Sequence, residues 1–139
     1  MQYIKILASS FFASIIICIF GLILTGHIVA LFVKSNYFGL SATTSSYFID
    51  AIAWGLPALI SSILISLINP KAPKAAAGTT AALTIGLFIA AYYFSAQAQN
   101  PNVSYIHEIA SLQFTILYAA IILTAFLGAH LSSYLRKPN

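Results

Sequence analysis

Residues 6–33 read ILASSFFASIIICIFGLILTGHIVALFV and contain no Asp, Glu, Lys or Arg, although Lys5 and Lys34 stand directly on either side. An α-helix rises about 1.5 Å per residue and the hydrocarbon core of a bilayer is about 30 Å thick, so about twenty apolar residues cross it. The apolar core of a cleaved signal peptide is only about 7 to 15 residues long. We therefore predict that this stretch forms a membrane-spanning helix that stays attached to the chain.

Three more uncharged runs follow, at residues 51–70, 75–107 and 109–135. Together the four runs predict an all-α fold, an integral membrane four-helix bundle in which residues 1–139 form a single transmembrane domain. We expect helices at about 5–33, 47–68, 75–95 and 107–135, external segments at about 34–46 and 96–106, and an inner turn at 69–74.

The composition supports a membrane protein. Hydrophobic residues make up 60% of the chain, charged residues 6%, and the mean hydropathy is +0.95, whereas about a quarter of the residues in a soluble domain are charged. The few cations lie at predicted helix ends, which indicates contacts with phospholipids and not with nucleic acid. The lipid bilayer is therefore an expected partner, together with other membrane protein chains or a second copy of this chain.

The distribution of charge predicts the orientation in the membrane. Short cytoplasmic loops carry an excess of Lys and Arg, and in a four-span arrangement most of the cations fall on one side. We expect both termini to be cytoplasmic, in the plasma (inner) membrane of a bacterium. The residues on the inner side are Lys5, Lys71, Lys74, Arg136 and Lys137, and those on the outer side are Lys34, Asp50 and Glu108.

Two stripes of small residues predict where helices pack. Small side chains let helix backbones approach closely in lipid. The first helix carries one stripe, in which Ser14 and Gly21 are expected to meet a neighbour. The third helix carries a second one, in which a small residue recurs every fourth position, and this stripe predicts either a seam within the chain or a seam between two copies. Its members are Gly78, Ala82, Gly86 and Ala90.

A group of polar side chains near the outer ends of the helices forms the candidate binding site. Ionisable groups in membrane segments are costly and are therefore candidates for function, but acids in a first helical turn also simply favour the positive end of the helix dipole. We leave both interpretations open: boundary residues, or a site for a cation, a proton or a lipid headgroup. The candidates are Asp50, Glu108, His107, His27, Thr115 and Tyr118.

The sequence predicts neither catalysis nor a bound cofactor. Cys18 is the only cysteine, so a thiol pair is excluded within the chain, and no Ser, His and Asp occur at a common depth. We predict no metal site, because His27, His107 and Glu108 lack an ordered ligand spacing. A single outer haem held by His27 and His107 is the alternative to having no cofactor.

These observations favour a non-catalytic membrane protein. Proton-coupled and ion-coupled carriers usually keep an ionisable group near the midplane of the membrane, and these spans carry their acids near the ends. We therefore expect a small subunit, an assembly factor or a stabilising factor of a larger membrane complex. The alternative is an oligomeric transporter or channel for an ion or small solute, with an outward-facing polar site.

Overall fold

The computed structural model describes the backbone of residues 1–35, 42–99 and 106–136, and the side chains of residues 1–31, 47–99 and 108–136. Within these ranges all regular structure is helical. Four of the helices contain segments long and apolar enough to cross a membrane, at Gln2–Leu31, Tyr47–Ile68, Pro73–Gln99 and Leu112–Leu135, which confirms the prediction of an all-α fold with four helices of membrane-spanning length. The helices are α1 (Gln2–Ser35), α2 (Ala42–Ile68), α3 (Pro73–Gln99), α4 (Ile106–Ile109) and α5 (Leu112–Leu135).

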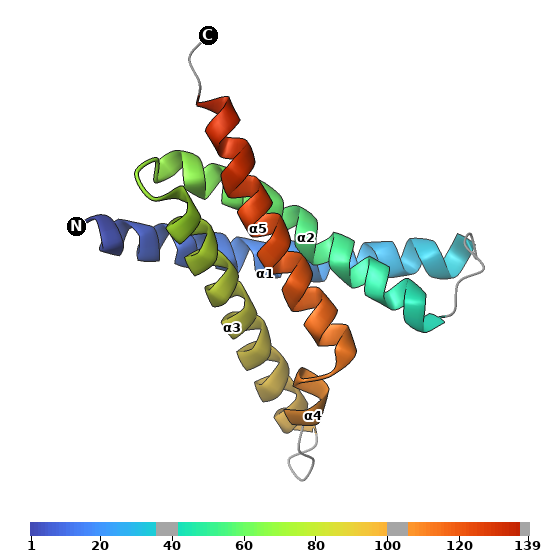
Figure 1. Cartoon of the computed structure of the whole chain (residues 1–139). Helices are drawn as coiled ribbons and strands as arrows, with labels where there is room; N and C mark the ends of the chain where they lie inside the picture. The colour runs from blue at the N-terminus through green and yellow to red at the C-terminus, as the bar shows by residue number, and fades with distance from the viewer. Residues whose placement is uncertain (36–41, 100–105, 137–139) are drawn as a thin grey trace.

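Two helical hairpins cross in the molecule: α1 with α2, and α3 with α5 (Figure 1). The most extensive contact joins α2 to α5, one helix from each hairpin, and α1 also packs on α3. Both of these contacts pair parallel helices. Ser10 hydrogen-bonds to Ala76 and Ser14 to Thr80, so a step of four residues along α1 matches a step of four along α3.

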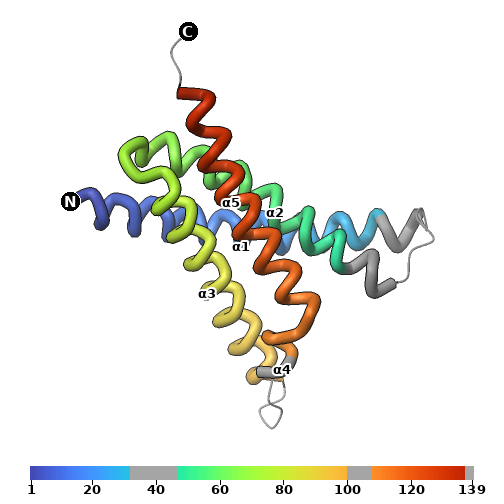
Figure 2. The backbone as a smooth tube through the Cα atoms, in the orientation of Figure 1, coloured from blue at the N-terminus to red at the C-terminus, as the bar shows by residue number. Residues whose placement is uncertain are grey.

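Hydrogen bonds join three parts of the chain at one end of the bundle. Lys5 Nζ donates to Ile68 O at 3.2 Å, and Arg136 Nη1 donates to Pro70 O at 3.0 Å. The start of α1, the turn between α2 and α3 and the finish of α5 therefore lie together, at what we call the turn end. The opposite end, where α4 lies, is called the α4 end (Figure 2).

The interior of the bundle consists mainly of small and hydroxyl side chains, and the large apolar side chains lie on the outside. This is the reverse of a soluble core, and it suits a membrane, because lipid tails are as apolar as leucine and close backbone approach becomes the main source of packing energy. The buried small residues include Ser10, Ser14, Ala53, Ala58, Ser62, Ala76, Ala77, Thr80, Ala81, Thr84, Ala125 and Ala129, and the exposed large ones include Phe11, Phe12, Phe20, Leu22, Leu64, Phe94 and Leu123.

Polar residues set the helix ends. Asn69 closes α2, since its side-chain amide donates to Ile65 O at 3.0 Å and to Ser9 Oγ at 3.2 Å, and Pro73 then begins α3. Between α4 and α5 the helix is interrupted, and the Ser111 hydroxyl accepts a hydrogen bond from the Phe114 N–H as the N-cap of α5. A serine in this position satisfies a backbone N–H that has no partner within the helix.

Candidate functional site

Asp50 joins α2 to α5 at the α4 end. Its carboxylate accepts a hydrogen bond of 2.7 Å from the side-chain amide of Gln113, and the contact is partly buried. A carboxylate bond from a neutral amide leaves the negative charge uncompensated, although it fixes the distance between the two helices. Asp50 therefore has a structural partner in addition to any ligand it binds.

Glu108 lies on α4 and is exposed. Its carboxylate accepts a hydrogen bond from the Tyr92 hydroxyl, which comes from α3. This bond spans the segment that connects the two helices, and so it links the short helix α4 to the finish of α3. The acid is accessible and, like Asp50, is engaged by a side chain of another helix.

The other candidates are bonded within their own part of the chain. Thr115 Oγ1 donates to Ser111 O at 2.9 Å, Tyr118 OH donates to Ile109 O at 3.3 Å, and His27 Nδ1 donates to Ile23 O at 2.9 Å. The side chain of His107 lies outside the described residues, and so does the predicted haem ligation that depends on it.

Each described candidate thus hydrogen-bonds to a residue outside the candidate set. The structure brings together Asp50 with Gln113 and Glu108 with Tyr92, and these are two separate pairs. Among the residues whose side chains are described, no three His, Cys, Asp or Glu residues are grouped closely enough to hold a metal ion. The arrangement can order helix ends and offer one exposed carboxylate at the α4 end.

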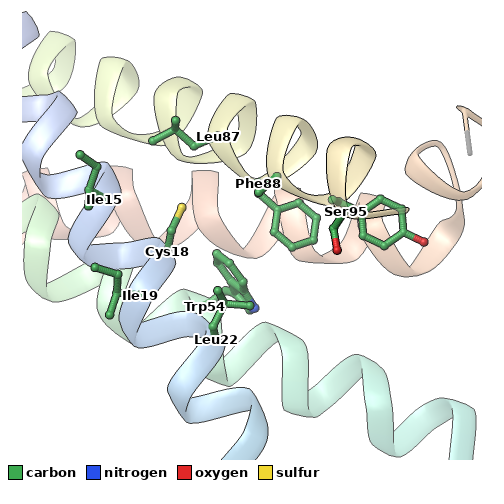
Figure 3. A pocket seen from close by; sticks show the side chains of 10 residues that line it. Ile15, Cys18, Ile19, Leu22, Trp54, Leu87, Phe88 and Ser95 are labelled. Carbon is green, nitrogen blue, oxygen red and sulfur yellow. The ribbon is translucent and has the colours of Figure 1, made fainter. Parts of the chain in front are cut away.

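An apolar cleft with a volume of about 560 Å³ opens between α1 and α3. The Trp54 indole from α2 lies between the α1 side chains and the Phe88 ring (Figure 3). Trp54 is only 3% exposed, and it fits because Gly21 leaves room: a Cβ at Gly21 would lie 2.7 Å from the indole. The cleft is lined by Ile15, Cys18, Ile19, Leu22, Trp54, Leu87, Phe88, Ala91, Tyr92 and Ser95.

Aromatic side chains from three helices form one wall beside this cleft. The Phe88 ring lies 4.9 Å from Trp54 and 5.3 Å from Phe114, edge to face in both cases, and Tyr92 lies 5.0 Å from Phe114. Sequence reasoning missed this cluster. Its signal was the spacing of four between Phe88 and Tyr92 and between Phe114 and Tyr118, which places each pair on one helix face.

The small residues predicted to pack divide into two groups. Ser14 is fully buried against α3, Gly21 contacts Trp54, and Gly78 lies near the Phe126 ring. In contrast, Ala82, Gly86 and Ala90 are exposed. A seam within the chain therefore includes Gly78 but not these three residues, and a seam with another chain stays a prediction.

Ala82 and Gly86 line a groove that we call the α3 outer face. A Cβ at Gly86 would have no atom within 4 Å. The groove has a volume of about 580 Å³, and Ile122 and Phe126 of α5 form one side of it. Its lining residues are Gly78, Ala81, Ala82, Ile85, Gly86, Ile89, Ile122 and Phe126.

Arg136 ties α5 to α2 at the turn end. Its guanidinium donates to Ser66 O and Pro70 O, which are carbonyls in the last turn of α2 and just beyond it, and to the Ser132 hydroxyl. A cation near the C-terminus of a helix is favoured by the helix dipole. The Nε atom of Arg136 is buried and has no partner among the described residues.

In comparisons with known proteins, no protein-family model, no curated protein and no solved structure matches the chain.

Proposed function

We propose that this protein is a non-catalytic, multi-pass membrane protein that acts as a small subunit, assembly factor or stabilising factor of a larger membrane complex. In this proposal a transmembrane helix of the partner packs on the α3 outer face. The observation that carries the proposal is the open space at Gly86, where a Cβ would meet no atom within 4 Å.

Membrane physics supports this assignment. A helix face made of large apolar side chains can rest against lipid without loss, because lipid tails are equally apolar. A face of Ala and Gly exposes backbone and gives up helix propensity at each Gly. Such a face is stabilised when another helix packs closely against it. Small residues at every fourth position favour this close packing.

The interior of the same chain shows how small residues look when a neighbour covers them. A Cβ at Gly128 would lie 2.7 Å from Leu59 O and 2.9 Å from Ser62 Cβ, so the α2 backbone fills the space that the glycine leaves. Gly86 is also a glycine inside a long apolar helix, but no neighbouring helix fills the space beside it. The proposed partner supplies it.

The charge distribution supports an orientation for the complex. Lys5, Lys71, Lys74 and Arg136 belong to the turn end, and the two acids belong to the α4 end. By the preference of cations for the cytoplasmic side, we propose that the turn end with both chain termini is cytoplasmic and that the membrane is a bacterial plasma membrane.

Native mass spectrometry of the complex, released gently from its own membrane, tests the proposal. We expect an assembly that contains this 14.9 kDa chain and at least one unrelated membrane protein. Gly86→Leu should remove the unrelated chain, since the new side chain occupies the contact. The matched control is Gly26→Leu on α1, where a Cβ also meets nothing within 4 Å, and this variant should keep the partner.

Two outcomes would overturn the proposal. An assembly made only of multiples of this chain would instead support the oligomeric transporter or channel, in which the Asp50, Thr115 and Glu108 side chains face a solute path. An unrelated chain that stays bound in both glycine variants would remove the α3 outer face as the docking site.

A further inference from the structure

The cleft between α1 and α3 contains a buried hydrogen-bond donor that the protein does not use. Trp54 is 97% covered by the rest of the chain, because its exposed fraction is 3%. Tryptophan has a single polar atom, the indole Nε1–H, which can only donate. Within the part of the chain that the structure describes, no hydrogen bond involves this group.

The free N–H keeps some access to the surface. Among the side-chain nitrogen and oxygen atoms of the described residues that are cut off from the surface, Arg136 Nε alone lacks a partner, so Trp54 Nε1 is not sealed inside the bundle. The surface that Trp54 lines is the cleft, with α1 side chains on one side and Phe88 on the other (Figure 3). A buried indole N–H normally finds an acceptor, and here the cleft is open to receive one.

The depth of Trp54 restricts which molecules can supply that acceptor. Its α-carbon lies seven residues after Tyr47, where the sequence predicts that the second span begins, and seven residues correspond to about 10 Å along the helix at 1.5 Å per residue. The ester and headgroup oxygens of a phospholipid stay in the interfacial region outside the hydrocarbon core. The acceptor must therefore belong to a molecule whose polar group enters the hydrocarbon.

The lining of the cleft favours a flat ring. Phe88 lies edge to face with Trp54 at 4.9 Å and nearly parallel to Tyr92 at 6.3 Å. Aromatic rings attract other rings in stacked and edge-to-face geometries beyond the gain from burial alone. The volume of about 560 Å³ falls within the range of about 300–1,000 Å³ that is usual for small-molecule sites.

We propose that this cleft binds a lipid-soluble molecule of the quinone class, with its ring against Phe88 and Trp54 and one ring carbonyl accepting the hydrogen bond from Trp54 Nε1. The molecule enters from the hydrocarbon of the membrane, because every lining residue belongs to a membrane-spanning segment. The site is separate from the α3 outer face, and it depends on no partner chain.

Trp54 provides its own probe, since it is the only tryptophan in the chain and quinones quench indole fluorescence on contact. The purified protein in phosphatidylcholine nanodiscs is titrated with decylubiquinone. We expect quenching that saturates at one quinone per chain, above the small linear quenching that partition into the lipid produces.

Two alanine variants separate binding in the cleft from collision in the membrane. Ala91→Phe places a ring inside the cleft and should abolish the saturable quenching. Ala119→Phe makes the same change at an exposed position of α5 outside the cleft and should leave it intact. Circular dichroism checks that both variants keep their helical content.

Trp54→Phe tests the hydrogen bond and does not depend on the fold of the Ala91 variant. Retained decylubiquinone is measured by its ultraviolet absorbance after gel filtration, and removal of one donor should weaken binding about two- to tenfold. Quenching that never saturates, equal quenching in the two alanine variants, or unchanged retention in Trp54→Phe would overturn the proposal. So would a phospholipid that decylubiquinone fails to displace from the cleft.

Discussion

The α2–α5 interface and the α3 outer face are both built on glycine and alanine, but only the first is closed. At the interface the Ser62 hydroxyl donates to Ala125 O at 2.5 Å, and Gly128 sits against the α2 backbone. On the α3 outer face Gly86 has nothing within 4 Å. Small residues at helical spacing therefore indicate that a helix is ready for close contact, and they do not say whether the contact lies inside the chain.

The difference lies in what accompanies the small residues. At the closed interfaces a hydroxyl donates to a carbonyl of the facing helix: Ser62 of α2 to Ala125 O of α5, and Ser14 of α1 to Thr80 O of α3. Such bonds favour one neighbour over others because they need a carbonyl at a defined position on the facing helix, although the Ser14 hydroxyl also lies 2.7 Å from Ser10 O of its own helix. The α3 outer face offers shape alone, which suits a contact whose other half comes from another molecule.

Gly128→Leu should have the largest effect of the substitutions that compare the α2–α5 interface with the α3 outer face. Overpacking of a filled interior costs about 1–3 kcal/mol and more when backbone must move, and the new side chain would collide with Leu59 O and Ser62 Cβ. We expect loss of the monodisperse peak in gel filtration and a large drop in the thermal unfolding midpoint. Gly86→Leu should change neither, and equal damage in both variants would show that the α3 outer face is closed.

Arg136→Gln tests the polar clamp at the turn end of the same interface. The substitution removes donors to Ser66 O and Pro70 O, and hydrogen bonds from charged groups contribute about 1.5–3 kcal/mol each at most. We expect a decrease of about 1–3 kcal/mol in the free energy of unfolding, measured by titration with a denaturing detergent. Arg136→Lys should restore part of it, and an unchanged value in Arg136→Gln would mean that α5 is held by apolar contacts alone.

Ser14→Ala compares the two faces of α3 itself. It removes the hydroxyl that lies 3.1 Å from Thr80 O across the α1–α3 contact, and hydrogen bonds between membrane helices average about 0.6 kcal/mol. We expect a loss of that size in the same unfolding titration. Ser133→Ala, whose exposed hydroxyl bonds only to its own helix, serves as the control and should have no measurable effect.

Glu108→Gln should have the smallest effect. The amide oxygen can still accept from Tyr92, and exposed substitutions away from buried networks stay within about 0.5 kcal/mol. We expect unchanged unfolding and, if the acid only orders α4, unchanged growth of cells that depend on the protein. A clear loss of growth with normal folding would give the carboxylate charge a role in binding or transport.

The four spans were predictable from sequence because the cost of placing charge in hydrocarbon is large and local. Residues 6–33 alone exceed the thickness of the membrane core, whatever their neighbours. The pairing of helices could not be predicted in the same way. The helices α1, α3 and α5 all carry small residues at suitable spacing, and the hydrophobic effect does not favour one pairing over another in lipid. The parallel pairing of α1 with α3 follows from the hydroxyl contacts, whose partners are backbone carbonyls and leave no trace in the sequence.

The polar candidates at the α4 end show the same limit. A helical wheel places Glu108, Thr115 and Tyr118 on one arc only if one helix runs through them, and the Ser111 cap interrupts it. Asp50 instead meets Gln113, and Glu108 meets Tyr92. Trp54 was visible as the single tryptophan, but its depth beside an open cleft depends on Gly21 of another helix.

The parallel pairing of the helices also constrains how the protein is made. The hairpin of α1 and α2 enters the membrane first, yet the carbonyls that the Ser10, Ser14 and Ser62 hydroxyls reach on facing helices belong to α3 and α5. Of these hydroxyls, that of Ser14 also donates to Ser10 O within α1. Until synthesis of the second hairpin is complete, the first one exposes three hydroxyls on a seam with no acceptor from a facing helix. A second copy whose second hairpin is already complete presents the missing carbonyls, so slow synthesis of α3 and α5 favours exchange of hairpins between neighbouring chains.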